Sequence, residues 1–458
     1  MILYDISFKL SIFMKTKLLN LSQDDLYLIS KQVLDLAKSN GASASEVEIS
    51  VSKGKTISTR MGNLDTVELN NGKSLTVTVF YGYRQGISTT SDFSKNALDA
   101  CVRAACQIAK YTAEDKAFGL AEPSLYCRDI KDLKIHNSYF DSQDLMIKKV
   151  LECENHALDF DTRITNSEGA QLNTSENLFV YLNSAGFVGG YPSSRSSLSC
   201  SVVAKNKFGM QRDYSFSTER AFNDLKAPNL VGTDAASRAV RRLDVRPIKT
   251  GKYPIIFEAP IASSIISSLI SAISGGNLYR ETSFLLNSLN TKIASEALSI
   301  FENPFLEKGH ASSNFDMDGV YLNERSILEK GLLKSYLLSS YTARKLGLKT
   351  TGNAGGAHNL IVTPSKNTLE QLIKGIDKGL LITELLGHGL NMVTGDYSRG
   401  AAGFWIESGK IQHAVEEITI ASNLKDMLLN IKAVGNDVYQ NSSKYTGSIM
   451  IEPMTVAT

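Results

Sequence analysis

Residues 46–90 alternate β-branched or aromatic residues with polar ones, and this period of two constrains the fold more than any other feature of the chain. Such alternation is typical of strands that bury one face of a sheet. Turn signals interrupt the segment at Asn71-Gly72, which is the strongest of them, and at Lys53-Gly54, Gly62-Asn63 and Gly82. Turns this short join antiparallel neighbours and leave no room for crossover helices, so we predict antiparallel sheets rather than a doubly wound parallel one.

Helical patterns flank the predicted strands. Residues 22–40 form one, with Ser22 as N-cap, and residues 94–112 form another that would cover the sheet. Further helices are predicted over 142–160, 230–245 and 261–275, with strands between them. We therefore predict an α+β fold, rich in hairpins, with three domains: an N-terminal domain over 1–125, a central domain over 126–248, and a Gly-rich, β-rich C-terminal domain over 249–458.

Composition narrows the class of protein. The net charge is +2 over 458 residues, and Lys and Arg are dispersed, which argues against a nucleic-acid partner. The five cysteines are odd in number and form no C-x-x-C, as expected of reduced thiols in the cytoplasm. No apolar run reaches the roughly 20 residues of a membrane span, and the first residues lack the features of a signal peptide. Met14 is an alternative start to Met1.

The six histidines give no metal motif. No two histidines have the spacing of H-E-x-x-H. On a helix, Glu384 and His388 would lie on the same face, but together they supply only two of the three protein ligands that a zinc site needs. We interpret His388 first as a structural histidine and second as a substrate contact.

Other motifs for chemistry are also missing. Asp316, Asp318 and Gly319 do not match a calcium loop and predict a turn instead. Ser398 lacks the G-x-S-x-G context, and no nucleotide-binding motif occurs.

Glycines gather beside polar and aromatic residues in the C-terminal third. Gly352, Gly355 and Gly356 precede His358, and Gly395 and Gly400 enclose a polar tetrapeptide. Two interpretations stay open: tight turns in a compact core, or a cleft that receives an extended peptide backbone. For the cleft we select six residues and predict neither a catalytic residue nor a metal ligand in this chain: His388, Asp396, Tyr397, Ser398, Arg399 and Gly400.

Several long strings resemble the TldD/PmbA family. They are "TELLGHGLNMVTGDYSRGAAGFWIESGKI" (383–411), "SYTARKLGLKTTGNAGGAHN" (340–359), "SGGNLYRETSFLLNSL" (274–289), "EITIASNLKDMLLNI" (417–431) and "TRITNSEGAQLNTS" (162–175). The resemblance runs from about residue 20 to the end and is closer to PmbA-type chains, also called TldE-type, than to TldD-type chains. It implies a cytoplasmic bacterial protease, built from a TldD-type and a TldE-type chain, that acts on peptides and small unfolded proteins.

The resemblance also implies which subunit this is. TldD-type chains hold zinc with H-E-x-x-x-H on a helix and a cysteine near the C-terminus. In this chain the histidine places fall on Ile266 and Ser271, the glutamate place on Ser267, and the cysteine place on Gly400. We therefore expect no cofactor here, zinc in a TldD-type partner, and a role in shaping the substrate cleft. Two alternatives remain: a metallopeptidase with an unrecognised metal site, and a stand-alone, non-enzymatic peptide-binding protein.

Overall fold

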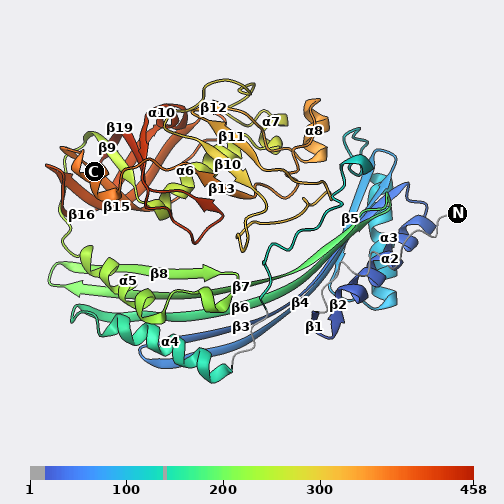
Figure 1. Ribbon diagram of the computed structural model, residues 1–458, viewed down its shortest axis with the longest axis horizontal. Coiled ribbons are helices and arrows are strands. Elements are labelled where there is room, and N and C mark those ends of the chain that lie inside the picture. Colours follow the sequence, from blue (N-terminus) through green and yellow to red (C-terminus); the bar gives the residue numbers. More distant parts are fainter. Residues whose placement is uncertain (1–15, 138–141) are drawn as a thin grey trace.

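The computed structural model describes residues 16–137 and 142–458, so the choice between Met1 and Met14 as the start lies outside the described residues. A long, curved sheet forms one side of the molecule, and a C-terminal body lies over its concave face (Figure 1). The antiparallel, multi-domain α+β fold predicted from the hairpin-rich sequence is confirmed. None of the helices among the described residues is both long and apolar enough to cross a membrane.

The curved sheet has six antiparallel strands in the order β5-β4-β3-β6-β7-β8. The strands are β3 (Ala44–Arg60), β4 (Asn63–Tyr81), β5 (Arg84–Thr90), β6 (Ile164–Asn183), β7 (Val188–Asn206) and β8 (Gly209–Glu219). The long ladder between β3 and β6 joins strands from the predicted N-terminal and central domains into this one sheet. Those two units therefore share a sheet, whatever boundary separates them in sequence.

Two of the predicted hairpin turns are wrong. Asn71-Gly72 lies in the middle of β4, and Lys53-Gly54 lies in the middle of β3, where Lys53 pairs with Asn71 across the ladder. The strands instead reverse at Gly62, where Met61 and Gly62 have positive φ, and at Gly82. The hydrogen-bonded pairing along the whole length of β3 and β4 outweighs the preference of each dipeptide for a turn, which contributes little free energy by itself. Gly72 accordingly marks a close approach, because a Cβ there would lie 2.5 Å from Ser52 Oγ.

Helices cover one face of the sheet in two pairs. α2 (Gln23–Ser39) and α3 (Lys95–Tyr111) bury the apolar residues at one end of the sheet, and α4 (Gln143–Leu158) and α5 (Pro228–Arg241) bury those at the other end. Ser22 caps α2 through a capping box with Asp25, as predicted. The opposite, concave face carries small polar side chains that stay half-buried, among them Ser50, Ser52, Thr56, Asn173, Asn177, Ser193, Ser197 and Ser199.

The C-terminal body contains a six-stranded mixed sheet and a five-stranded mixed sheet around one apolar core. The first has the order β16-β15-β14-β9-β19-β17 and consists of β9 (Gly251–Phe257), β14 (Lys378–Leu386), β15 (Asp396–Glu407), β16 (Lys410–Asn423), β17 (Ile431–Val434) and β19 (Ile449–Ala457). The second has the order β12-β11-β10-β13-β18 and consists of β10 (Ile300–Asn303), β11 (Arg325–Glu329), β12 (Leu332–Leu333), β13 (Asn359–Val362) and β18 (Lys444–Tyr445).

Short elements complete the fold. The helices of the C-terminal body are α6 (Ala259–Ala272), α7 (Gly275–Tyr279), α8 (Ser340–Leu346), α9 (Leu369–Lys374) and α10 (Leu424–Leu429). Near the N-terminus β1 (Lys17–Leu18) pairs with β2 (Leu21–Ser22), and single 3-10 turns occupy Pro123–Leu125 and Phe222–Asp224. Loops of the body reach the sheet, where Phe187 and Phe315 meet edge to face with centroids 5.1 Å apart. This junction positions the candidate site.

Candidate functional site

A cavity of about 390 Å³ lies at the junction between the concave face of the sheet and the C-terminal body, and we call it the junction cavity. Strands β6 and β7 supply one wall, and two loops of the C-terminal body supply the other. Its lining residues are Ile135, Asn177, Phe179, Tyr191, Ser193, Arg220, residues 310–313, residues 315–317 and residues 354–358. Residues from five distant parts of the sequence therefore meet here.

Aromatic rings form the sheet side of the junction cavity. Phe179 of β6 and Tyr191 of β7 are cross-strand partners whose ring centroids lie 5.6 Å apart. Phe315 extends this wall from the C-terminal body, with its centroid 5.7 Å from that of Tyr191. Aromatic walls of this kind provide a large apolar contact area with a defined shape.

His358 lines the junction cavity on the opposite side, and a buried carboxylate orients it. Its Nδ1 lies 3.1 Å from Glu302 Oε1, and Glu302 also binds Arg325 Nη2 at 2.6 Å and Asn353 Nδ2 at 2.9 Å. Burial by itself would raise the pKa of Glu302, but the hydrogen bond from His358 and the charge of Arg325 lower it below its usual value. Glu302 is thus an ionised acceptor, and Nδ1 of His358 is the ring nitrogen that faces it and donates to it.

Glycines bring backbone close to the junction cavity. Gly355 and Gly356 have φ of +94° and +112°, which side chains other than hydrogen rarely permit. A Cβ on Gly355 would lie only 2.7 Å from Met317 Cγ. The sequence singled out these glycines beside His358, and the structure places the segment 354–358 in a cavity wall.

Arg220 closes one end of the junction cavity. Its side chain is largely buried, and its guanidinium donates to the backbone carbonyls of Ser194, Gly309 and His310. Burial, followed by the nearby charge of Arg195, lowers the pKa of Arg220 to about 10. The pKa of His310 falls to about 4 through burial and through the same two arginines, so His310 is neutral at pH 7.

Sequence reasoning did not find Glu302, Arg220 or His310. They stand on a short strand, at the end of β8 and in a loop, and no local spacing connects them. The glycines before His358 were the one feature of the sequence that pointed to this region. A glycine indicates that unusual backbone angles are possible, whereas long-range contacts leave no mark in the local sequence.

The six predicted cleft residues lie elsewhere, along β15 and the turn before it. The Ser398 amide donates to Gly389 O at 2.7 Å, and Gly400 pairs with Leu386, so the turn that carries His388 runs beside β15. His388, Asp396 and Ser398 are exposed, and Arg399 and Gly400 are half-buried. Tyr397 is only 4% exposed and packs in the core of the C-terminal body. The residues therefore form the first part of a strand that is paired with β16 and β14, and the turn before it, with one ring turned inward. The junction cavity has other walls.

The segment that carries Glu384 and His388 is not helical. Glu384 lies in β14, where it forms an ion pair with Arg242 at 2.5 Å, and His388 follows the end of that strand. Glu384 and His388 therefore do not share a helix face, because β14 is held between β9 and β15. The turn predicted at Asp318-Gly319 is confirmed, with Gly319 at φ +77°.

The places that would hold zinc by resemblance do not fit the ion. Ile266 is fully buried in the core, where it has no donor atom to offer. The Ser267 hydroxyl donates to Ser263 O at 2.8 Å, and Gly400 has no side chain. Over residues 16–137 and 142–458, no three His, Cys, Asp or Glu side chains lie close enough to hold a metal ion.

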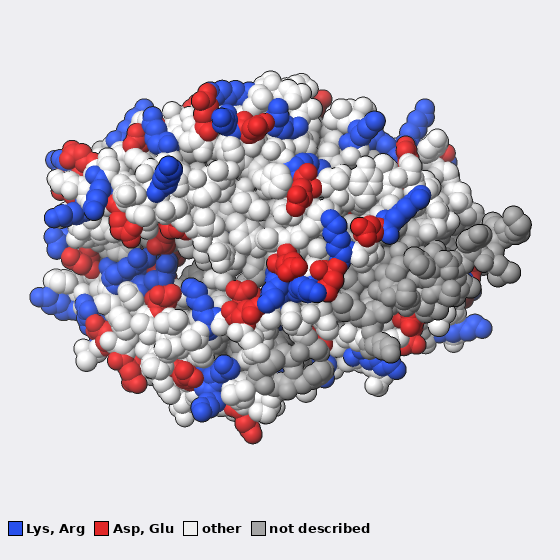
Figure 2. Space-filling view, viewed as in Figure 1, with Lys and Arg blue, Asp and Glu red and all other residues white. Residues whose placement is uncertain are grey.

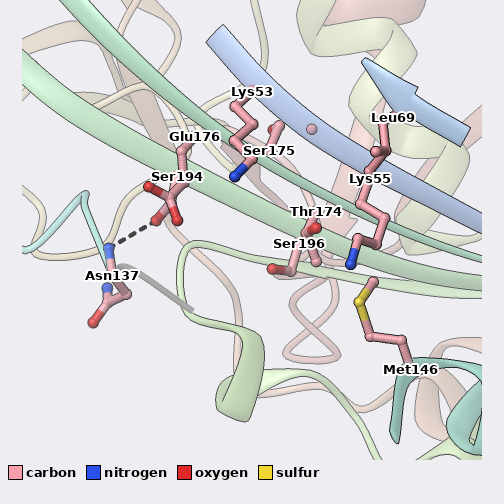
Figure 3. A pocket seen from close by; sticks show the side chains of 11 residues that line it. Lys53, Lys55, Leu69, Asn137, Met146, Thr174, Ser175, Glu176, Ser194 and Ser196 are labelled. Atoms are coloured by element: carbon pink, nitrogen blue, oxygen red, sulfur yellow. Dashed lines mark hydrogen bonds between the residues drawn. The ribbon is translucent and has the colours of Figure 1, made fainter. Parts of the chain in front are cut away.

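A smaller cavity of about 130 Å³ lies on the helix-covered face of the sheet (Figure 3). Polar strand residues face it, including Lys53, Lys55, Thr174, Glu176 and Ser196, with Met146 of α4 at its rim. The amide of Asn137 donates to Ser194 Oγ at 2.8 Å and closes one side. The polar lining falls in the gap between the two helix pairs, where neither pair buries the sheet.

Family models match most of the chain. The PmbA/TldA metallopeptidase domain 1 matches residues 45–109, the central domain matches residues 140–243, and the C-terminal domain matches residues 250–458. "Metalloprotease PmbA" of Escherichia coli O157:H7 is 44% identical over 93% of this chain and 94% of its own length. The "Metalloprotease PmbA homolog" of Haemophilus influenzae is 41% identical over 96% of this chain and 98% of its own length.

Solved structures show the same fold. A putative modulator of DNA gyrase from Bacteroides thetaiotaomicron superposes with a TM-score of 0.90 at 30% identity, over 95% of this chain and 99% of that one. The structure of TldE from Thermococcus kodakarensis superposes with a TM-score of 0.82 at 22% identity, over 94% of this chain and 100% of that one. The latter likeness is one of fold alone.

Proposed function

Because the chain belongs to the PmbA/TldA metallopeptidase family, we propose that it is a PmbA/TldE-like subunit of a two-chain metalloprotease that degrades or processes peptides and small unfolded proteins. In this proposal a TldD-type partner carries the zinc and cleaves the peptide bond. The present chain carries no cofactor, completes the substrate cleft and supports the partner's active site.

The observation that carries the proposal is the identity of the residues at the zinc places. Amide hydrolysis by a metallopeptidase needs a metal-bound water and a general base. Ile266 is buried in the core, Ser267 is engaged with the helix backbone, and Gly400 has no side chain, so these places offer neither ligand nor base. A chain that keeps the fold without these groups is suited to binding and positioning.

The surroundings support a peptide as the substrate. The concave face of the sheet is lined by hydroxyl and amide side chains, which form hydrogen bonds without a preference for charge. Lys and Arg are interspersed with Asp and Glu over the face of the molecule seen in Figure 2, so this face offers no broad basic surface of the kind that binds nucleic acid. The five cysteines are all free thiols, in keeping with our proposal that the protein works in the cytoplasm.

The test is to purify this chain and a TldD-type chain separately and to assay cleavage of an unstructured peptide by each chain and by the mixture. We expect the mixture alone to cleave rapidly and the two chains to co-elute in gel filtration. Equal cleavage by the partner without this chain would refute the proposed role.

A metallopeptidase in its own right is the second candidate, because the curated relatives carry the name metalloprotease. Measuring the metal content of the purified chain distinguishes this second candidate from the proposed non-catalytic subunit. We expect the purified chain to hold no stoichiometric zinc, and His388→Ala to leave its metal content unchanged, because His388 belongs to no group of three His, Cys, Asp or Glu side chains that could hold a metal ion among the described residues. Near-equimolar zinc that survives mild chelation would favour the second candidate, above all if His388→Ala released it.

A further inference from the structure

Two guanidinium groups beside the junction cavity have no acidic partner among the described residues. Arg220 is 9% exposed and donates only to backbone carbonyls. Arg195, on the concave face of β7, donates to His310 O at 3.3 Å and otherwise faces solvent. A buried cation without a counter-ion is costly, and its field is strong where water is scarce. This end of the junction cavity is therefore electropositive.

The carboxylates near the junction cavity do not compensate that charge. Glu302 is held by Arg325 and His358 on the far side of the imidazole. Asp316 lines the cavity, but its two oxygens accept the backbone amides of Asp318, Val320 and Ala354. Burial and the neighbouring Asp318 raise the pKa of Asp316 to about 7.

The other walls of the junction cavity indicate which chemical groups of a ligand would lie beside its anionic group. The rings of Phe179, Tyr191 and Phe315 offer an apolar surface to a side chain. The Nδ1 of His358 is bonded to Glu302, so in the neutral ring the Nε2 atom is an acceptor that can receive an N–H group. An anion beside an apolar side chain and an amide N–H is the chemistry of a peptide end.

We infer that the junction cavity binds a peptide carboxylate that adjoins an apolar side chain, as at a C-terminal phenylalanine or leucine. The carboxylate lies toward Arg195 and the free N–H of Arg220, the side chain lies against the aromatic wall, and His358 accepts a backbone N–H. The inference deepens the proposed function and rests on it, since it assumes peptide ligands. It assigns this subunit a recognition site of its own, separate from any metal.

Binding is measured by fluorescence anisotropy with three probes: fluorescein-Gly-Gly-Ala-Phe with a free carboxylate, the same peptide as the C-terminal amide, and the amide of fluorescein-Gly-Gly-Glu-Phe. The intact chain is titrated alone and with its partner present. Because charge-assisted hydrogen bonds are about twice as strong as neutral ones, we expect the free acid to bind at least about tenfold more tightly than its amide. If the glutamate-containing amide equals the free acid, the carboxylate is supplied by a side chain, and the site is still an anion site.

The variant Arg195→Gln should bring the affinity for the free acid close to that for the amide. Phe179→Ala should weaken the acid and the amide equally. The matched control is Arg103→Gln, whose exposed side chain lies on α3 and pairs with Asp99, and it should change neither affinity. Variants are compared at equal thermal stability, and Arg220 is left intact because its backbone contacts join the sheet to the loop at 309–310.

Equal affinities for the free acid and its amide, or no saturable binding of either, would overturn the inference. If the mixture with the partner still cleaves peptides in that case, the proposed function stands and this inference alone fails. If the chain discriminates between acid and amide but neither associates with a partner nor affects cleavage, the proposed function fails and the recognition site remains.

Discussion

At the scale of single residues, two buried glutamates show that partners decide the charge state of a carboxyl group. Glu302 is 1% exposed, yet its pKa is lowered because hydrogen bonds from His358 and the charge of Arg325 outweigh burial. Glu46, on the concave face of β3, lies beside acidic neighbours and accepts a hydrogen bond from Tyr181 OH at 2.8 Å. Burial raises its pKa to about 7, and the nearby Asp318 adds to the shift.

Glu302→Ala should lower the free energy of unfolding by about 3–5 kcal/mol, because it removes the carboxylate that pairs with Arg325 in a largely buried place and takes one acceptor from Asn353. Urea denaturation at pH 7 measures the change. The control Glu296→Ala removes an exposed carboxylate that pairs with Lys292, and it should leave stability near that of the wild type. Equal effects of the two substitutions would contradict this account of the Glu302 network.

Glu46 should make a contribution to stability that falls as the pH rises from about 4.5 to about 7. Its pKa is 4.5 ordinarily and about 7 in the fold, so the folded state retains a proton that the unfolded chain has released. The favourable contribution is complete below pH 4.5 and is lost once the pH passes 7. Asp316, whose pKa is also raised to about 7, acts in the same direction.

Glu46→Gln keeps a neutral side chain at every pH, so its free energy of unfolding should decline less between pH 5 and pH 8 than that of the wild type. The exposed Glu68 on β4 provides the control, and Glu68→Gln should follow the wild-type curve. Denaturation curves at three pH values suffice. A Glu46→Gln variant that kept the full pH dependence would show that Glu46 is not a source of it.

At the scale of elements, long pairings and close helix contacts override local preferences. β3 and β4 continue through Lys53-Gly54 and Asn71-Gly72, although each dipeptide favours a turn. Helices α4 and α5 approach so closely at Gly232 that a Cβ there would lie 2.0 Å from the carbonyl oxygen of Cys153. Glycine in a helix interior lowers helix stability, so at this position the close packing of the two helices, and not helix propensity, accounts for the glycine.

Gly232→Ala should therefore destabilise the protein, although alanine is the better helix former. The gain in helix propensity is about 1 kcal/mol, and overpacking against a backbone carbonyl costs about 1–3 kcal/mol or more. We expect a net loss of about 2 kcal/mol and a lower Tm. Gly209→Ala is the matched control, because no atom lies within 4 Å of its Cβ position, and it should be close to neutral. A stabilised Gly232→Ala variant would mean that the two helices separate easily.

At the scale of the whole molecule, one sheet crosses the boundary predicted at residue 125. β3 pairs with β6 along most of its length, and Leu178, Val180 and Leu182 of β6 belong to the core under α2 and α3. The N-terminal and central units thus complete each other's core. The C-terminal body, by contrast, has its own sheets and its own large core.

A fragment spanning residues 1–245 should fold and unfold in one cooperative transition, whereas residues 1–125 alone should aggregate. The shorter fragment leaves β3 as an unpaired edge and exposes apolar residues that β6 covers. Circular dichroism during thermal unfolding, with light scattering, distinguishes the outcomes. A stable, monomeric 1–125 fragment would show that the first unit is an independent domain.

The sequence by itself determined the class of fold, the five longer helices and the family. These predictions rest on local signals, which depend only on residues that are near one another in the sequence. Examples are the period-two alternation over 46–90, the cap at Ser22 and the small-residue helix at 261–275. Only the tertiary structure decided that the predicted turns at 53–54 and 71–72 lie inside strands, that Glu384 sits in a strand beside Arg242, and that Arg220, His358 and Phe179 surround one cavity. Glu384 and Arg242, like His358 and Phe179, are more than a hundred positions apart in the sequence, and the energy of such contacts comes from packing and pairing that no short window of sequence contains.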